Sequence, residues 1–177
     1  MSSSENDSSS SSRDALENGD PSEKIKAWLE LTRNSQGHLI AGDYMAALIP
    51  HLHLHTVSPT ARPPSATFVY TVQADHCNRM RSLHGGAAAT LFDYCTTLVL
   101  VLVSRPGFWS YLGVSRSLNV TYLRPATCGQ ELLIECQLLQ VGKRLATLRG
   151  TMRRRSDGEV LSVCEHGKAN IDPEMKL

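Results

Sequence analysis

The sequence lacks an excess of charge of either sign and lacks closely spaced cysteines. Its 18 basic and 17 acidic residues leave a net charge of +1, which offers no electrostatic case for binding nucleic acid or an acidic membrane. The cysteines are odd in number and without a C-x-x-C motif, which argues against a disulfide framework or a zinc site and fits a reducing compartment. They are Cys77, Cys95, Cys128, Cys136 and Cys164.

The N-terminal end lacks the apolar segment of a secretory signal. Residues 1–21 are rich in serine and acidic residues and contain a single arginine, which also argues against a mitochondrial presequence. We expect residues 1–21 to be a disordered tail. Residues 22–177 are expected to form a single domain with an N-terminal helical extension. A cytoplasmic location is expected, with a mitochondrial one left open.

One stretch, residues 85–103, is apolar and nearly long enough to cross a membrane. It carries Asp93 at its middle, and a charge at that depth is costly in lipid. We therefore predict no membrane span and a helix buried inside a folded protein.

The spacing of apolar residues predicts one long helix among several strands. Helices are expected from Pro21 or Ser22 onward, over residues 43–48 and over residues 84–103. Strands are expected over residues 51–57, 67–74, 113–122, 131–141, 144–155 and 160–169. The Asp157-Gly158 pair predicts a hairpin between the last two strands. Because the long helix is apolar nearly all round and the later connections are short, we predict a curved antiparallel sheet wrapped around one central helix, an α+β hotdog fold.

The start and the middle of the long helix carry the groups suited to chemistry. Gly85 and Gly86 expose N–H groups that have no partner inside the helix, and the helix dipole adds partial positive charge there. Such a position suits an oxyanion hole. Asp93 is a carboxylate among apolar residues, which suits a general base or a nucleophile. Alternatively, its carboxylate only caps a neighbouring loop or joins an ion pair.

The spacing of these two groups has a geometric consequence. Gly85 and Asp93 are eight residues apart, about 12 Å along a helix. Both cannot reach one reacting centre from a single straight helix. A twofold dimer in which one chain supplies Gly85 and the other Asp93 would satisfy the geometry, so we expect a homodimer, with a homotetramer also open.

A wider pattern of residues resembles the PaaI-type hotdog thioesterases, among them the small acyl-CoA thioesterases of animals. The matching positions are Asn78, His84, Gly85, Gly86, Asp93, residues 113–115, residues 119–126, Gly129 and residues 141–146. The resemblance covers about residues 67–170. It implies hydrolysis of an acyl-CoA, or of a related acyl thioester such as an acyl carrier, in lipid metabolism.

The resemblance also implies a role for each matching residue. Asp93 would activate water or attack the thioester, the Gly85 N–H would polarise its carbonyl, and Ser115 would hold the water. Asn78 would position substrate or water, and His84 would orient the loop. The residues that would contact substrate or coenzyme A are Gly86, Arg124, Pro125, Gly142, Lys143 and Arg144; Arg and Lys suit its phosphates.

Two other functions remain open on the sequence alone. A hydratase, a dehydratase or another acyl-thioester-processing enzyme of secondary metabolism on the same scaffold could use His84 with Asp93 as a proton shuttle. A non-catalytic acyl-thioester binding protein could use the insertion around Phe108 and Trp109 to shape its pocket. We expect no metal and no other cofactor, since His51, His53 and His55 are expected to share an exposed strand face without supporting carboxylates.

Overall fold

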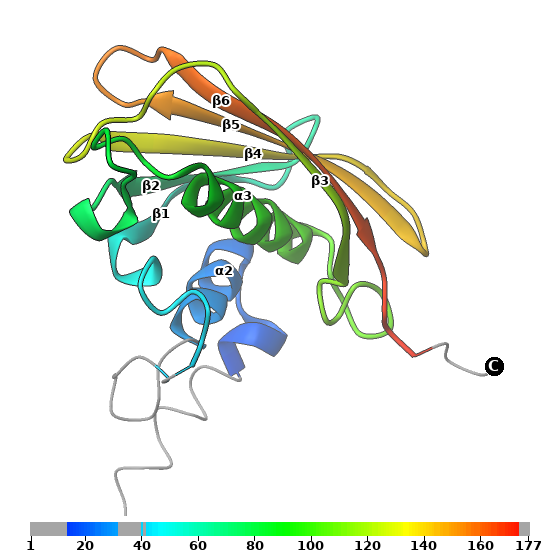
Figure 1. Ribbon diagram of the computed structural model, residues 1–177. Coiled ribbons are helices and arrows are strands. Elements are labelled where there is room, and N and C mark those ends of the chain that lie inside the picture. The colour runs from blue at the N-terminus through cyan, green and yellow to red at the C-terminus, as the bar shows by residue number, and fades with distance from the viewer. Residues whose placement is uncertain (1–13, 32–39, 41, 174–177) are drawn as a thin grey trace, which may run out of the picture.

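The structure is a computed structural model that describes residues 14–31, 40 and 42–173. A six-stranded sheet, antiparallel throughout and strongly curved, wraps around one helix (Figure 1). Its strands are β1 (Leu52–Ser58), β2 (Ser65–Thr71), β3 (Val114–Tyr122), β4 (Glu131–Val141), β5 (Leu145–Arg154) and β6 (Val160–Ala169). Their spatial order is β1-β2-β4-β5-β6-β3, which leaves β1 and β3 at the edges. The predicted α+β hotdog fold is confirmed.

The central helix, α3 (Gly85–Val99), continues into the 3₁₀-helix η3 (Leu100–Leu102). Leu91, Phe92 and Leu98 are fully buried against the concave side of the sheet. On the other side lies helix α2 (Pro21–Glu30), which places Ile25 in the core (Figure 1). Cover on both sides explains why α3 is apolar nearly all round. By length and composition alone the segment Gly85–Leu102 could also cross a membrane, but half of it is buried inside the fold.

The N-terminal region differs from the predicted tail. Residues 14–18 are helical, and a capping box of Asp20 and Glu23 then starts α2. Residues 14–21 therefore belong to the ordered extension, whereas residues 1–13 lie outside the described part of the chain. The expected helix over residues 43–48 is instead a series of turns that leads into the 3₁₀-helix η1 (Ile49–His51), because Asp43 caps the Met45 N–H and Pro50 follows closely.

The later strands match their predicted ranges within a residue or two. The β5–β6 hairpin turns through Asp157 and Gly158, and Gly158 has a φ of 75°, a conformation that favours glycine. The β3–β6 register pairs Tyr122 with Ser162 and Val114 with Ala169. The segment after β3 therefore lies at the end of the sheet with the β5–β6 hairpin, and the segment before β3 lies at the opposite end with the β4–β5 turn.

Candidate active site

The start of α3 is built around His84, which is the N-cap of the helix. Its Nδ1 accepts the Gly86 N–H at 3.0 Å, and its own N–H donates to the His76 carbonyl oxygen at 2.8 Å. The Gly86 N–H is thus used inside the cap. In the described part of the chain the Gly85 N–H has no acceptor, so it is available to a ligand at the helix N-terminus.

Tyr122 supports Gly85 from β3. Its hydroxyl donates to the Gly85 carbonyl oxygen at 2.7 Å, and its ring lies beside Gly85, where a Cβ would come within 3.4 Å of it. The first residue of the helix is therefore held between its cap and a strand. This contact was not anticipated from the sequence.

Asn78 shapes the loop that precedes the helix. Its Oδ1 accepts the N–H groups of Met80 and Ser82, at 2.9 and 3.2 Å. Asn78, Met80 and Ser82 then line a cavity beside Gly85, whereas the intervening Arg79 and Arg81 are not among the lining residues. Met80 is thus the one residue of the Arg79–Arg81 stretch that lines this cavity.

This cavity has a volume of about 340 Å³. Its buried wall is mostly apolar, formed by Leu83, Ala88, Ala126, Met152 and Leu161. Arg124 and Pro125, both predicted to contact coenzyme A, line the same cavity. The space next to the Gly85 N–H thus suits a ligand that is largely apolar with a few polar groups.

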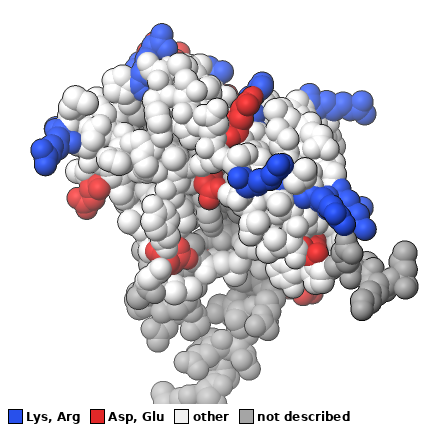
Figure 2. Space-filling view, turned by 45° about the vertical axis from the view of Figure 1, so that its right-hand side comes forward, with Lys and Arg blue, Asp and Glu red and all other residues white. Residues whose placement is uncertain are grey.

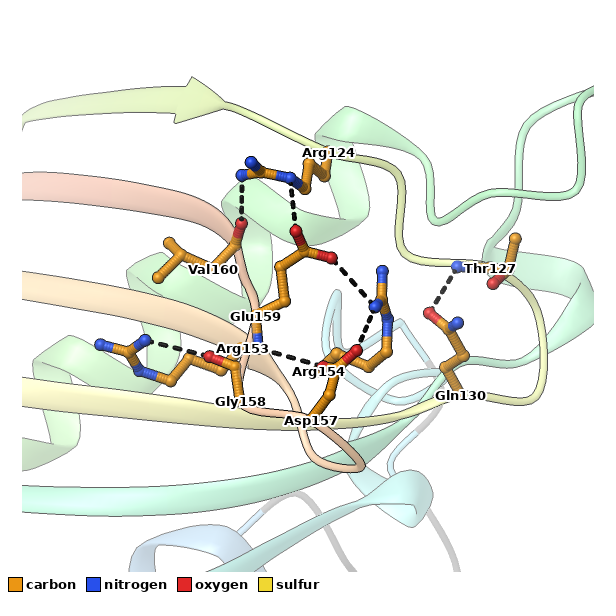
Figure 3. Close-up of polar contacts among 9 residues, drawn as sticks. All are labelled: Arg124, Thr127, Gln130, Arg153, Arg154, Asp157, Gly158, Glu159 and Val160. Atoms are coloured by element: carbon orange, nitrogen blue, oxygen red, sulfur yellow. Dashed lines mark hydrogen bonds and ion pairs between the residues drawn. The ribbon is translucent and has the colours of Figure 1, made fainter.

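Arg124 is tied to the β5–β6 hairpin (Figure 3). Its Nε lies 2.7 Å from Glu159 Oε1, and its Nη1 donates to the Val160 carbonyl oxygen at 3.3 Å. Glu159 also contacts Arg154, which pairs with Asp157 at the turn. The charges of Arg124 and Arg154 are therefore partly compensated by the hairpin itself.

Asp93, in the middle of α3, faces β3 and β6. Its Oδ1 accepts a hydrogen bond from the Ser115 hydroxyl at 2.5 Å, and His166 Nε2 lies 3.2 Å from the same oxygen. The Asp93 side chain is 45% exposed. The predicted pair of Asp93 and Ser115 thus meets in one chain, and the carboxylate is both anchored and open to solvent.

His166 completes this cluster, and the sequence analysis did not identify it. It is fully buried, with Nε2 3.0 Å from Ser115 Oγ and Nδ1 2.7 Å from Thr96 Oγ1. Burial lowers its pKa to about 4, against the opposing effect of the Asp93 charge. His166 is therefore neutral near pH 7, so its 3.2 Å approach to Asp93 is not an ion pair there.

A pattern in the last strand could have revealed His166. Cys164, His166 and Lys168 alternate along β6, and all three are buried. On a strand this spacing sends every second side chain to one face. Two titratable residues on the inward face opposite the central helix are unusual, because burial of such groups is costly without partners.

Gly142, Lys143 and Arg144 form the β4–β5 turn. The Gly142 carbonyl oxygen accepts the Trp109 indole N–H at 2.8 Å, and the Lys143 carbonyl oxygen accepts from Asn170. This turn lies at the opposite end of the sheet from Arg124. One chain alone therefore does not bring the two predicted coenzyme A-binding groups together.

The insertion before β3 is part of the scaffold. Trp109 is fully buried, and Phe108 lies under the Arg105 guanidinium, 4.5 Å from it. Neither ring lines the cavity beside Gly85. The expectation that this insertion shapes that pocket is therefore wrong for the single chain.

The three N-terminal histidines do not share one face. His53 and His55 are exposed on β1, whereas His51 lies in η1 with its ring centroid 6.1 Å from that of His76. His76 in turn contacts the Tyr70 hydroxyl through Nδ1. Among the described residues no group of three or more His, Cys, Asp or Glu side chains could hold a metal ion.

Comparisons with known proteins agree with this geometry. A family model described as Thioesterase superfamily matches residues 80–161. Mouse acyl-coenzyme A thioesterase 13 is 32% identical over 109 residues, which is 62% of this chain and 75% of that protein. This identity and coverage show the family to which the chain belongs.

Solved structures show the same fold. Zebrafish thioesterase superfamily member 2 superposes with a TM-score of 0.68 at 24% identity, over 84% of this chain and 96% of that one. The PaaI protein of E. coli superposes with a TM-score of 0.58 at 17% identity, over 67% and 82% of the two chains.

The acyl-coenzyme A thioesterase relative favours hydrolysis over the hydratase and binding-protein alternatives. The chain belongs to the thioesterase superfamily and is a thioester hydrolase.

Proposed function

We propose that the protein hydrolyses acyl-CoA, or a closely related acyl thioester, to the free acid and the thiol. The observation that carries this proposal is the Asp93 carboxylate, which Ser115 and His166 hold while nearly half of its side chain stays exposed. The name of the mouse relative, an acyl-coenzyme A thioesterase, supports coenzyme A as the carrier.

In the proposed reaction Asp93 acts as the general base toward a water molecule. The Ser115 hydroxyl anchors one carboxylate oxygen and helps to position the water, while neutral His166 supports Ser115 from behind at 3.0 Å. A well-placed base typically accelerates such a step by about 10²–10⁴-fold. The reaction requires water and these side chains, without a metal or redox cofactor.

The Gly85 N–H polarises the thioester carbonyl and stabilises the oxyanion that forms. Asn78 faces the same cavity and is proposed to orient the substrate there. The Gly86 N–H is already bound by His84. The role of Gly86 is to let the His84 ring pack closely against the helix, because a Cβ at this position would come within 3.1 Å of His84 Nδ1.

A second copy of the chain completes the site in this proposal. Asn78, Gly85 and Arg124 lie at one end of α3 and the sheet, whereas Asp93 and Ser115 lie toward the other. A twofold axis beside edge strand β3 would bring the first group of one chain to the second group of its partner.

Strand β3 has the properties of such an interface. It is an edge strand, with Val114 and Tyr122 about half exposed at its ends, and unpaired edges readily add another strand. Figure 2, which brings this side forward, shows a mostly uncharged surface with separate charged side chains. In such a dimer the Gly142–Arg144 turn of one chain would approach the Arg124 end of the other and contact the coenzyme A moiety with it.

The first test replaces Asp93 by asparagine and follows thiol release from a panel of acyl-CoA substrates. We expect a loss of about 10²–10⁴-fold in kcat with the fold retained, because the amide is isosteric but cannot accept a proton. Glu165→Gln, the same chemical change on an exposed residue of β6, is the control. Wild-type rates in Asp93→Asn would refute the assignment.

The second test removes a single N–H group. Gly85→Pro deletes the proposed oxyanion donor at the first helical position, where proline is tolerated; the preceding residue, His84, has φ −61° and ψ 137°, which suits proline. We expect kcat to fall by about 10²–10³-fold. Gly85→Ala keeps the N–H and is expected to retain most of the activity.

A further inference from the structure

Lys168 is a buried cation next to the proposed active site. Its side chain enters from β6, where it is 3% exposed and is the cross-strand partner of Ser115 on β3. Its Nζ donates to Thr97 Oγ1 at 2.7 Å. Burying an ammonium group costs free energy unless it is paired, so this position suggests a functional role for Lys168.

Thr97 connects Lys168 to Asp93. The Thr97 hydroxyl accepts from Lys168 and donates to the Asp93 carbonyl oxygen at 2.7 Å. The ammonium group is thus two hydrogen bonds away from the backbone of the proposed base. Asp93 and Thr97 are four residues apart on α3, so their side chains lie on the same face of the helix.

The charged and titratable groups that face Lys168 are few. Asp93 faces it from α3, where its charge opposes the effect of burial, and His166 lies two residues away on β6. From the neighbouring strands its partners are Ser115 on β3 and Ala146 on β5, neither of which is charged. Since His166 is neutral near pH 7, Lys168 supplies the positive charge on this side of Asp93.

We propose that Lys168 is a positioning residue whose buried ammonium, through its hydrogen bond to Thr97, holds the Asp93–Thr97 turn in place. It does not touch the substrate. This role rests on the proposed function and adds to it a charged group that supports the base. The Asp93 charge in turn favours the charged form of Lys168 against the effect of burial.

The proposal has a consequence for the pH dependence of the reaction. Burial lowers the pKa of Lys168 to about 8, so the ammonium loses its proton in mildly alkaline solution. Activity should then decline on the alkaline side, because the charged hydrogen bond that holds the Asp93–Thr97 turn is weakened.

The test compares pH–rate profiles of kcat/KM for the wild type, Lys168→Met and Lys168→Arg. In Lys168→Met we expect kcat/KM to be lower and the alkaline limb to disappear, because the group that loses its proton there has been removed. Lys168→Arg, which stays charged, should hold its activity to higher pH. KM should change less than kcat.

The competing explanation is a purely structural role, in which Lys168→Met lowers activity by the same factor at every pH. An alkaline limb that persists unchanged in that variant would overturn the proposal. If Lys168→Met does not fold, Thr97→Val removes the hydroxyl acceptor at equal size, with Thr97→Ser as its control. We then expect the alkaline limb to move to lower pH in the valine variant only; coincident limbs in the two variants would also overturn it.

Failure of this proposal is distinguishable from failure of the proposed function. If Asp93→Asn abolishes thiol release while the Lys168 variants leave the alkaline limb unchanged, Asp93 is the base and Lys168 is only structural. If Asp93→Asn remains active, the assignment of the base itself is wrong.

Discussion

At the scale of single residues, the polar groups around Asp93 form a chain of hydrogen bonds inside an apolar core. Ser115 links the carboxylate to His166, and His166 reaches Thr96 on the same helix as Asp93. The Thr96 hydroxyl lies 2.7 Å from His166 Nδ1 and 2.6 Å from the Phe92 carbonyl oxygen, so each buried member of the chain has a partner. Such a network fixes side-chain orientation, which a positioned base requires.

The buried state of His166 predicts a pH dependence of stability. Its pKa falls from 6.5 to about 4 on folding, so between these values the unfolded chain binds more protons than the folded one. Stability from this residue is therefore complete above about pH 6.5 and is lost as the pH falls toward 4.

We expect the free energy of unfolding in urea to decrease over this window in the wild type. In His166→Gln the decrease should be smaller, although the variant is less stable at pH 7. His53→Gln, a change at an exposed histidine, should retain the wild-type slope. Parallel slopes for the wild type and His166→Gln would contradict the prediction.

At the scale of elements, the site depends on how closely α3 approaches the sheet. Gly150 on β5 lies directly beneath the helix: a Cβ there would come within 2.6 Å of Phe92 Cδ1 and 2.8 Å of Cys164 Sγ. Both neighbours are buried and have little room to move. The absence of a side chain at this position lets the helix bring Asp93 to Ser115 and His166.

Gly150→Ala should therefore destabilise the fold by about 1–3 kcal/mol through overpacking. Chemical denaturation measures the effect, and Phe92→Leu in the same chain should recover part of it. Gly142→Ala is the matched control, because its Cβ would meet other atoms no closer than 3.5 Å. Equal stability of the two alanine variants would show that the contact at Gly150 relaxes without cost.

At the scale of the whole molecule, the residues of the proposed site fall into two groups at opposite ends of one chain. The Gly85 N–H and Arg124 lie near the β5–β6 hairpin, and Ser115 and the Gly142–Arg144 turn lie at the other end. A site shared between two chains reunites these groups. It also makes activity depend on association.

Mixing two inactive variants tests the shared site. Asp93→Asn and Gly85→Pro chains, refolded together, should form mixed dimers in which one of the two sites carries both intact groups. Random pairing predicts recovery of about a quarter of the wild-type thiol release. If each site lies within a single chain, every site in the mixture keeps one defect and no activity returns.

The sequence alone determined the architecture and much of the candidate site. Alternating strands, the Asp157-Gly158 turn and a helix apolar on all sides left few ways to bury the apolar faces. The family resemblance of His84, Gly85 and Asp93 added the prediction of thioester hydrolysis. These features are local or periodic, so the sequence alone reveals them.

The tertiary structure alone decided which side chains meet. His166 and Lys168 are far from Asp93 in the sequence, and their contacts depend on the register of β6 against β3 and on the approach of α3 to the sheet. It also decided that the Gly86 N–H belongs to the helix cap and that Trp109 belongs to the scaffold. Such contacts arise from packing between segments that are distant in the sequence, and a local sequence pattern does not predict them.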